Sequence, residues 1–425
     1  MIQIAILGYG VVGSGILQVL EQNRIHIEKK AGQTIMVKRV LDKRELSGTP
    51  AEPLLTRDIE TILADDDIQV VAEVMGGVDP AYDYVKRALL HGKHVCTSNK
   101  ELVIKHGAEL FALAMERELN FMFEASVGGG IPVVRPINLA LTTDEIVGIS
   151  GILNGTSNFM LTQMYHFGNS YEEALQEAQR LGYAEADPTA DTGGYDASRK
   201  LAILLSLATG KQVAFEDIQT EGIGDIKPID FAFAQSFGFS IKPMVSGRLL
   251  DNYRLEAISA PFLVHSGQPL SAVFGVFNGV MVQAKATGDV MFYGQGAGQL
   301  PTAGAVISDI VDVAKHLHRH ITYAWSNDRA TVLPASGYVN RRMIRISCEE
   351  GFEEEFNKTL QLSVGIVEEA PVMRINKYPN HLAWITPLET EPETLARLEK
   401  LKAILGFKAV ERVLRVYEPV KSNAY

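Results

Sequence analysis

Four carboxylates and a basic pair are concentrated in one short segment, residues 181–200 (LGYAEADPTADTGGYDASRK). The acids are Glu185, Asp187, Asp191 and Asp196, and the basic pair is Arg199 and Lys200. Pro188 and the glycine pair after it interrupt regular structure, and an apolar run typical of a buried helix, LAILLSLA, follows directly. Charges this dense beside a core helix are costly to desolvate unless they are paired or used. The segment therefore indicates a site that could hold an ammonium group and move a proton.

The spacing of Asp196 and Lys200 allows two interpretations. The residues are four positions apart, so both lie on one face of the first turn of the expected helix. Asp196 could be the N-cap of that helix with Lys200 as its exposed partner, which is the simpler role for an isolated pair. A lysine beside an acidic cluster also stays protonated and could supply a proton.

A glycine-rich turn follows the first expected strand, residues 2–8 (IQIAILG), and opens a helical stretch through about Glu28. Its GxGxxG spacing allows a tight turn, close approach to a pyrophosphate and close helix–sheet packing, with the helix N-terminus facing the phosphates. A bare turn is the alternative. In this strand–turn–helix context the motif predicts dinucleotide binding by five residues, Gly8, Gly10, Val11, Val12 and Gly13.

The residues after the second expected strand leave the choice of cofactor open. Asp42 could accept a hydrogen bond from a ribose 2′-hydroxyl, which favours NAD. Lys43 and Arg44 could pair with a 2′-phosphate, which favours NADP. A solvated turn explains the basic pair equally well. We expect NADP or NAD, with NADP weakly favoured.

Two later strand ends also carry residues suited to a ligand. Carboxyl ends of parallel strands face the ligand crevice, so Gly76 is expected near the cofactor. The same holds for Thr97, Ser98 and Lys100 after the next strand, where Lys100 could hold a carboxylate or a developing oxyanion. A strand-ending turn and an exposed loop lysine are the alternatives.

Two more loops precede helices. Residues 294–298 form a second glycine-rich loop, and Gly298 is expected at the dinucleotide unless the loop is a mere inter-domain connection. In the segment NGTSN, residues 154–158, Ser157 or Asn158 could be the N-cap of the following helix.

Strands and helices alternate through the first third of the chain. Strands are expected at 2–8, 34–41, 70–74, 94–97 and 121–123, and helices at about 11–28, 82–91 and 102–116. This alternation predicts an α/β fold with right-handed βαβ units and a Rossmann-type, doubly wound parallel sheet. The dinucleotide-binding domain would span residues 1–127, with a return segment at about 295–325.

The pattern changes after residue 127. Residues 128–294 mix strand-like pieces with helices, which indicates an α+β substrate-binding and dimerisation domain. An amphipathic helix is expected at 303–316. Residues 338–425 read strand–helix–strand–strand–helix–strand, the ferredoxin-like βαββαβ order.

Composition excludes several classes of protein. The 425 residues exceed one ordinary core, and 46% hydrophobic with 21% charged content is typical of a soluble globular protein. A net charge of −11 without a basic stripe disfavours nucleic-acid binding. No apolar run is long enough for a membrane helix, and no signal peptide is recognisable. Two distant cysteines give neither a disulfide framework nor a zinc pattern, which suits the cytoplasm.

Taken together, the motifs resemble one enzyme family. The chain contains, in order, GxGxxG, EVMGG, TSNKEL, FEASVGGGIP, GILNGTSNFML, LGYAEADPTADTGGYDASRK and GQGAGQLPTAGAVISD. This series closely resembles homoserine dehydrogenase over roughly residues 1–320, and residues 181–200 are its most specific part. The C-terminal unit is similar to an ACT domain, a small ligand-sensing module. The resemblance implies interconversion of L-aspartate 4-semialdehyde and L-homoserine with NAD(P)H, a step of threonine, methionine and isoleucine biosynthesis.

The resemblance also implies roles for single residues. Lys200 would donate a proton to the aldehyde oxygen, Asp196 would hold or relay for it, and Lys100 would orient substrate and nicotinamide. Lys100 would share substrate binding with Thr156, Tyr183, Glu185 and Asp191, the last two at the substrate ammonium. Asp187, which precedes a proline, is expected to be structural. A monovalent cation, Na⁺, would be bound at Glu124, Val127, Gly129 and Ile131.

Two rival functions remain as alternatives. An aldehyde-oxidising dehydrogenase needs a nucleophilic cysteine, and neither Cys96 in a strand nor Cys348 in the C-terminal unit follows an exposed nucleophile turn. A non-catalytic sensor of nucleotides and amino acids would need neither Lys200 nor Asp196. By resemblance we expect a homodimer or homotetramer with a small-molecule substrate, a possible threonine effector at the ACT-like unit, and no nucleic-acid or membrane partner.

Overall fold

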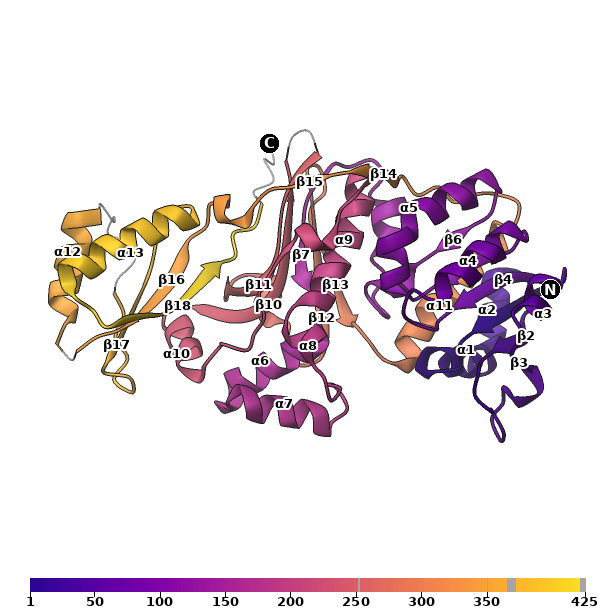
Figure 1. The fold of residues 1–425 in the computed structure, drawn as a ribbon, viewed down its shortest axis with the longest axis horizontal. Coiled ribbons are helices and arrows are strands. Elements are labelled where there is room, and N and C mark those ends of the chain that lie inside the picture. Colours follow the sequence, from indigo (N-terminus) through magenta and orange to yellow (C-terminus); the bar gives the residue numbers. More distant parts are fainter. Residues whose placement is uncertain (251–252, 350, 365–371, 421–425) are drawn as a thin grey trace. The chain divides into compact units, whose positions relative to one another are not determined.

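The computed structural model describes residues 1–250, 253–349, 351–364 and 372–420, and Figure 1 colours them along the chain. Contacts divide the chain into two compact units. The first comprises residues 1–146, 199–217 and 284–331. The second comprises residues 147–198 and 218–283 and the chain from residue 332 onward.

The first unit is built on a six-stranded parallel sheet with the order β3-β2-β1-β4-β5-β6. Its strands are β1 (Ile2–Leu7), β2 (Ile35–Leu41), β3 (Leu55–Thr56), β4 (Ile68–Glu73), β5 (His94–Thr97) and β6 (Phe121–Met122). The order reverses between β1 and β4, which is where such sheets bind ligands. The predicted doubly wound sheet is confirmed, and only the two-residue strand β3 lacks a counterpart in the prediction.

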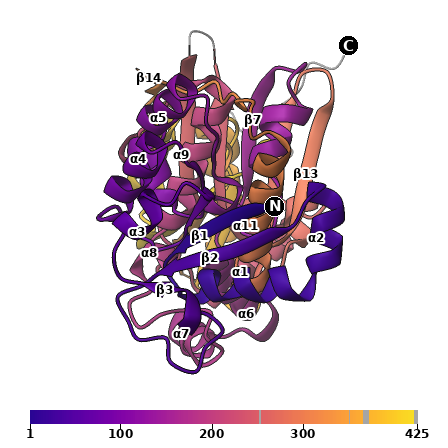
Figure 2. The same cartoon turned by 90° about the vertical axis from the view of Figure 1, so that its right-hand side faces the viewer.

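Helices cover both faces of this sheet. The helices are α1 (Val11–Gln22), α2 (Arg24–Ala31), α3 (Glu60–Leu63), α4 (Ala81–Leu90), α5 (Lys100–Glu116) and α11 (Gln299–Lys315), with a π-helical turn at Pro136–Ala140. Helices α1, α2 and α11 pack together on one face, and α4 packs with α5 on the other (Figure 2). The predicted return segment is therefore α11, and a Cβ at Gly15 of α1 would lie 2.9 Å from the Gln299 carbonyl oxygen.

One predicted helix is wrong. The helical stretch expected through Glu28 is two helices, because Asn23 leaves helical geometry at φ −108° and ψ 17°. Three further strands belong to the first unit. The short strands β8 (Lys211–Gln212) and β14 (Ser326–Arg329) pair with each other, and β13 (Gly288–Gln295) precedes α11.

The second unit contains a mixed sheet with the order β12-β7-β10-β11-β18-β16-β17. Its strands are β7 (Ile146–Ile152), β10 (Phe239–Leu249), β11 (Arg254–His265), β12 (Phe277–Ala284), β16 (Arg342–Ser347), β17 (His381–Ile385) and β18 (Ala409–Val416), with β9 (Gln219–Thr220) alongside β11 and a short β15 (Thr331–Val332). The sequence pattern missed β11 because nearly every residue in it is buried, so it has no polar–apolar alternation.

The helices of the second unit are α6 (Gly155–Phe167), α7 (Tyr171–Arg180), α8 (Thr189–Thr192), α10 (Pro228–Ser236), α12 (Glu353–Val364) and α13 (Glu391–Leu405). Helix α9 (Tyr195–Thr209) runs from the second unit into the first. Two cap predictions are wrong. Asn154, not Ser157 or Asn158, caps α6 by accepting the Ser157 N–H at 2.8 Å, and Asp196 lies inside the first turn of α9. No helix in the described ranges is long and apolar enough to span a membrane.

The C-terminal strands share a core with the rest of the second unit. Strand β18 pairs in parallel with β11, which joins the C-terminal sheet to the central one. One face of β16 and β17 packs against α12 and α13 through Ile344 and Trp384. The other face contributes Met343 and Ala383 to a cluster that includes residues of α6 and α10. The strand expected between α12 and β17 falls largely on residues 365–371, outside the described residues.

A buried ion pair crosses this shared core. The Arg345 Nε donates to the Asp230 Oδ1 at 3.0 Å, and the two side chains are 2% and 0% exposed. Asp230 also accepts the Lys227 N–H at the start of α10. An ion pair this deep is expensive to break, because removing one partner leaves an uncompensated buried charge. It fixes where α10 lies on the C-terminal sheet.

Lys242 of β10 provides a test of how the core of the second unit responds to pH. Its Nζ donates to the Val273 carbonyl oxygen at 2.6 Å and lies 3.5 Å from the centre of the Phe274 ring. Burial lowers the pKa of Lys242 to about 7 from 10.5, so in this window the unfolded chain binds more protons than the folded chain. The contribution of Lys242 to the free energy of unfolding is therefore fully present above pH 10.5 and is lost as the pH falls towards 7.

We expect Lys242→Met to remove this dependence. The free energy of unfolding of the wild type should rise relative to the variant by up to about 1.4 kcal/mol per pH unit between pH 7 and 10.5. Urea unfolding at several pH values measures it, with the exposed Lys285→Met as control. Parallel curves for wild type and Lys242→Met would contradict the assignment.

Candidate active site

The first glycine loop is shaped by contacts that exclude side chains. Gly8 has a φ of +97°, and a Cβ at Gly13 would lie 2.0 Å from the Gly8 carbonyl oxygen. Gly10 is the N-cap of α1, has no side-chain capping bond and would meet no atom within 4 Å. The loop thus brings bare backbone to the N-terminus of α1, beside the exposed Val11. This arrangement suits a pyrophosphate, because free N–H groups and the helix dipole both favour negative charge.

Asp42, which follows β2, is held beside this loop. One carboxylate oxygen accepts the Tyr9 N–H at 2.8 Å, and the other accepts the Arg44 N–H at 2.9 Å. The Arg44 guanidinium donates to both oxygens and to the Tyr9 carbonyl oxygen. The Arg44 guanidinium holds the pKa of Asp42 well below its usual range. Asp42 is therefore a charged anchor for Arg44, which is itself exposed, as is Lys43.

A buried carboxylate ties together the ends of β4 and β5. Glu73 accepts from the Thr97 Oγ1 at 2.6 Å and from the Met75 N–H at 2.8 Å, and burial raises the pKa of its carboxyl. The Asn99 amide donates to the Gly77 carbonyl oxygen at 2.5 Å, while its oxygen caps α5. Lys100 is the first residue of α5, so these bonds fix where its backbone begins.

The same edge holds the other residues predicted there. Ser98 donates its N–H to the Glu73 carbonyl oxygen at 3.2 Å, and Gly76 turns the chain after β4 with a φ of +78°. The sequence motifs EVMGG and TSNKEL include Glu73 and Asn99, but sequence reasoning gave neither residue a role of its own. The available signal was a lone carboxylate ending the otherwise apolar strand VVAEV.

A second buried acidic cluster lies beside α11. Glu124 accepts three backbone N–H groups, from Val133 at 2.6 Å, Val134 at 2.9 Å and Arg135 at 2.8 Å. Asp309 of α11 accepts the Glu124 N–H at 3.0 Å and the Arg135 Nη2 at 2.7 Å. Burial, opposed by Arg135 and reinforced by Glu124, raises the pKa of Asp309 to about 7. Two acids thus face one guanidinium.

The second glycine loop, residues 294–298, lies against the chain bend that follows Glu124. A Cβ at Gly129, which has a φ of +56°, would lie 2.4 Å from the Gly296 carbonyl oxygen. Val127 and Ile131 flank this bend and are buried, and Ile131 donates its N–H to the Gly128 carbonyl oxygen at 2.9 Å. Gly298, at a φ of +126°, is the N-cap of α11. The glycine-rich bend at residues 128–130 and the second glycine loop at residues 294–298 are therefore in close backbone contact within the first unit.

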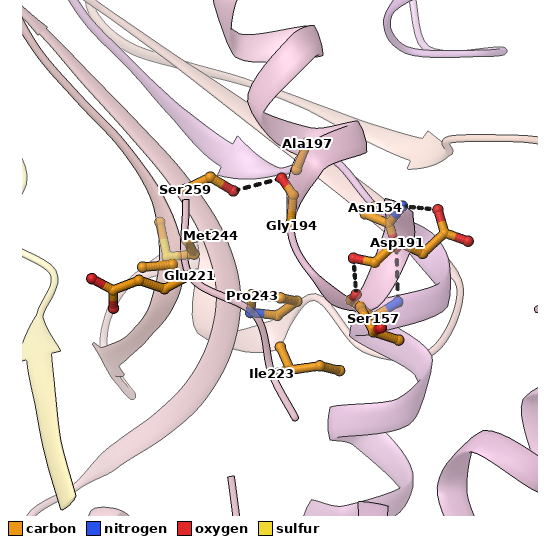
Figure 3. Close-up of a pocket in the computed structure, with 12 residues that line it drawn as sticks. Asn154, Ser157, Asp191, Gly194, Ala197, Glu221, Ile223, Pro243, Met244 and Ser259 are labelled. Atoms are coloured by element: carbon orange, nitrogen blue, oxygen red, sulfur yellow. Dashed lines mark hydrogen bonds between the residues drawn. The ribbon is translucent and has the colours of Figure 1, made fainter. Parts of the chain in front are cut away.

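In the second unit one amide joins two carboxylates. The Asn154 Nδ2 donates to the Asp191 Oδ1 at 2.7 Å and to the Asp196 Oδ2 at 3.0 Å. The Ser157 Oγ donates to the Asp191 carbonyl oxygen at 2.8 Å (Figure 3). Asp191 lies on α8 and Asp196 on α9, so Asn154 at the start of α6 holds three helices together. Sequence reasoning named the NGTSN segment but gave Asn154 no role.

The remaining residues of the acidic segment lie around this centre. The Thr156 Oγ1 donates to the Tyr183 carbonyl oxygen at 2.6 Å, and Glu185 is exposed. Asp187 accepts from the N–H and the Oγ1 of Thr189, the first residue of α8, which fits a structural role. Lys200 is half-buried on α9, one turn after Asp196.

Comparison with known proteins points to one family. The profile described as "Homoserine dehydrogenase, NAD binding domain" matches residues 8–124, and that described as "Homoserine dehydrogenase" matches residues 132–311. The homoserine dehydrogenase of Bacillus subtilis is 41% identical over 325 residues, 76% of this chain and 75% of that protein. The chain belongs to the homoserine dehydrogenase family.

Solved structures of the same family share this fold. A homoserine dehydrogenase from Thiobacillus denitrificans has a TM-score of 0.86 at 34% identity, covering 98% of each chain. The enzyme of S. aureus has a TM-score of 0.80 at 33% identity, covering 98% of this chain and 99% of that one. A hyperthermophilic archaeal homoserine dehydrogenase, described in complex with NADPH, has a TM-score of 0.62 at 25% identity, covering 73% and 97%. This chain is therefore an oxidoreductase of the homoserine dehydrogenase family, with a nicotinamide-binding domain.

The cysteine-dependent rival does not fit these features. Cys96 is fully buried in β5, and burial raises the pKa of its thiol well above the usual value. Cys348 is also buried, and its thiol pKa is raised for the same reason. A buried thiol with a raised pKa is a poor nucleophile.

Two glycine variants separate folding of the loop from cofactor binding. Gly13→Ala places a methyl group 2.0 Å from the Gly8 carbonyl oxygen, so we expect a lower thermal midpoint and no cofactor binding. Gly10→Ala meets nothing within 4 Å, so the fold should persist while the methyl group obstructs the pyrophosphate. We expect its Kd for NAD(P)H to rise about tenfold or more. Thermal melts and fluorescence titration measure both effects, and equal behaviour of the two variants would contradict this geometry.

Proposed function

We propose that this chain catalyses the reversible reduction of L-aspartate 4-semialdehyde to L-homoserine with NAD(P)H. The observation that carries the proposal is the pair of carboxylates, Asp191 and Asp196, joined by the Asn154 amide. Asp196 lies on α9, the helix that also carries Lys200. The names of the relatives support the substrate, and the glycine loop supports the cofactor.

A bound nicotinamide would supply or accept the hydride. Gly8, Gly10 and Gly13 offer bare backbone at the N-terminus of α1, with Val11 and Val12 as its first residues, so the pyrophosphate would lie there. We further assign the cofactor edge to Gly76, Thr97 and Ser98, and Gly298 to the second loop. Asn99 and Glu73 set the start of α5 and thereby position Lys100 to orient the substrate.

The acidic segment is suited to an amino-acid substrate. An ammonium group needs anionic acceptors. Glu185, in the loop before α8, and Asp191, on α8, would provide them. The Asn154 amide keeps Asp191 in one orientation, and Thr156 holds the backbone at Tyr183. Tyr183 also packs against Phe159, which rigidifies this side of the segment.

Lys200 is the proposed proton donor. Reduction of the aldehyde carbon leaves an alkoxide on oxygen, which needs a nearby cation and then a proton. Lys200 follows Asp196 by one helical turn on α9, and the Asp196 carboxylate is buried. Asp196 is proposed to hold or relay for Lys200, while the Asn154 amide fixes the carboxylate.

The loop after β2 favours NADP. Asp42 is already occupied by the Tyr9 N–H and Arg44, so it is a poor acceptor for a ribose hydroxyl. Arg44 is thereby held at the end of the strand with its guanidinium exposed, next to Lys43. A 2′-phosphate would find two cations there.

We expect Arg44→Ala to shift the cofactor preference. Loss of the guanidinium should raise the KM for NADP⁺ by about tenfold, while NAD⁺ is unaffected or favoured because Asp42 is released. Steady-state KM values for both cofactors measure the shift. The matched control is Arg57→Ala. Arg57 is also an exposed arginine of the first unit that pairs with an acid, in this case Glu45. An unchanged ratio of the two KM values would count against the role of Arg44.

We also propose a monovalent cation, Na⁺, at Glu124, Val127, Gly129 and Ile131. The support is a buried cluster in which Glu124 and Asp309 face one guanidinium, so a further cation would balance the charge. The Glu124 carboxylate already accepts three N–H groups, so ligands would come mainly from backbone carbonyls of the bend. Within the described residues, no group of three or more His, Cys, Asp or Glu comes together.

The C-terminal unit is proposed to be ACT-like, with threonine as a candidate effector. Its described order, β16-α12-β17-α13-β18, with both helices on one face of the sheet, is compatible with a ferredoxin-like module. The homodimeric or homotetrameric assembly and the cytoplasmic location stay predictions from the sequence.

An activity assay tests the function and separates it from the sensor alternative. Purified protein with homoserine and NAD⁺ or NADP⁺ should form NAD(P)H, followed at 340 nm, roughly the absorbance maximum of reduced nicotinamide. Parallel assays with and without threonine, and with sodium replaced by tetramethylammonium, test the effector and the cation.

Lys200→Ala should bind cofactor normally but lose turnover by about three orders of magnitude or more. The control is Lys211→Ala, in strand β8 just after α9 ends. Turnover retained in Lys200→Ala would refute the mechanism, and absence of turnover in the wild type would favour a sensor.

A further inference from the structure

Arg415 of β18 lies between two acids at the junction of the C-terminal and central sheets. Its Nη1 donates to both carboxylate oxygens of Glu221, at 2.8 and 2.7 Å, and its Nη2 donates to Glu391 at 3.1 Å. The pairing of Arg415 with Phe262 of β11 fixes the strand that carries it. The C-terminal sheet therefore holds the segment after β9 through a charged side chain.

Glu221 begins a stretch of backbone that contacts helix α8. The Glu221 N–H donates to the Ser259 carbonyl oxygen at 2.8 Å, and the Ile223 N–H donates to the Thr192 carbonyl oxygen at 2.9 Å. A Cβ at Gly222 would lie 2.7 Å from that same Thr192 oxygen. No side chain separates the two segments, so a shift of Glu221 is passed directly to the C-terminal end of α8.

Helix α8 is one turn long and carries Asp191. Residues of this helix help to line a cavity of about 10 Å³, which has room for about one water molecule. The other lining residues include Asn154, Glu221 and Ser259 (Figure 3). A helix this short is not stable alone, and incomplete packing beneath it leaves its position to hydrogen bonds. Besides the Ile223 bond, the Ser259 Oγ donates to the Gly194 carbonyl oxygen at 3.0 Å.

The side chain of Glu221 points away from the carboxylates it helps to place. Figure 3 shows its carboxylate directed away from Asn154 and Asp191, on the far side of Gly194. A partly exposed ion pair contributes little to overall stability, and Glu221 is 37% exposed. Its effect is expected to be local, on the geometry of the segment it anchors.

We propose that Arg415 is a positioning residue for the substrate, acting through Glu221 on the helix that carries Asp191. Arg415 fixes Glu221, the backbone at Gly222 and Ile223 fixes Thr192, and α8 then presents Asp191 to Asn154. This inference rests on the proposed role of Asp191 at the substrate ammonium. It gives the C-terminal sheet an indirect part in substrate binding, separate from the binding of any effector.

The test is the effect of Arg415→Ala on the two substrates separately. A misplaced Asp191 should raise the KM for homoserine by about tenfold and change the KM for NADP⁺ less than about twofold. Arg415→Lys keeps one contact and should fall in between. Because both act through one contact, the effects of Arg415→Ala and Glu221→Ala should not multiply in the double variant.

Arg374→Ala is a matched control. Arg374 also belongs to the C-terminal unit and pairs with Glu353, with exposures of 16% and 39% against 10% and 37% for Arg415 and Glu221. We expect wild-type KM values for this variant. A rise in homoserine KM as large as that of Arg415→Ala would mean a general structural effect and would overturn the proposal.

Hydrogen exchange provides a readout that does not depend on turnover. In Arg415→Ala, peptides covering residues 189–194 and 221–226 should exchange faster, while the control variant leaves them unchanged. If the wild type does not turn over homoserine, the proposed function fails and exchange alone decides the link. If the wild type is active and Arg415→Ala has a normal homoserine KM and normal exchange, only the positioning role is refuted.

Discussion

The hydrogen bonds from the Asn154 amide to Asp191 and Asp196 are the constraint on which the proposed substrate site depends. Two carboxylates on neighbouring helices repel each other, and a shared donor removes much of that cost. Because Asn154 also caps α6, its own position is set by the helix it starts. One side chain therefore fixes the relative placement of α6, α8 and α9.

Backbone contact plays the same role in the first unit. Gly13 lies against Gly8, and Gly129 lies against Gly296, at distances that leave no space for a Cβ. The first of these contacts leaves bare backbone at the N-terminus of α1, where a dinucleotide phosphate would lie. Glu73 adds a buried carboxylate that joins two strand ends, so the edge of the sheet is held by polar bonds within the core.

The C-terminal segment is part of the second unit's core. Strand β18 extends the central sheet, and the buried pair of Asp230 and Arg345 holds α10 against it. A sheet built in this way can affect the position of the acidic segment through fixed contacts, with no conformational change. Arg415 and Glu221 give that influence a definite route, which runs through backbone hydrogen bonds to α8.

The sequence by itself determined the doubly wound sheet, the glycine loop and the acidic segment, because these follow from local patterns of polarity and turn residues. It missed β11, which is buried on both faces, and it misassigned the cap of α6. Only the tertiary structure decided that Asn154 joins two acids, that Glu73 ties β4 to β5, and that Arg415 reaches Glu221. Those contacts join residues distant in the chain, and no local periodicity encodes which of them meet.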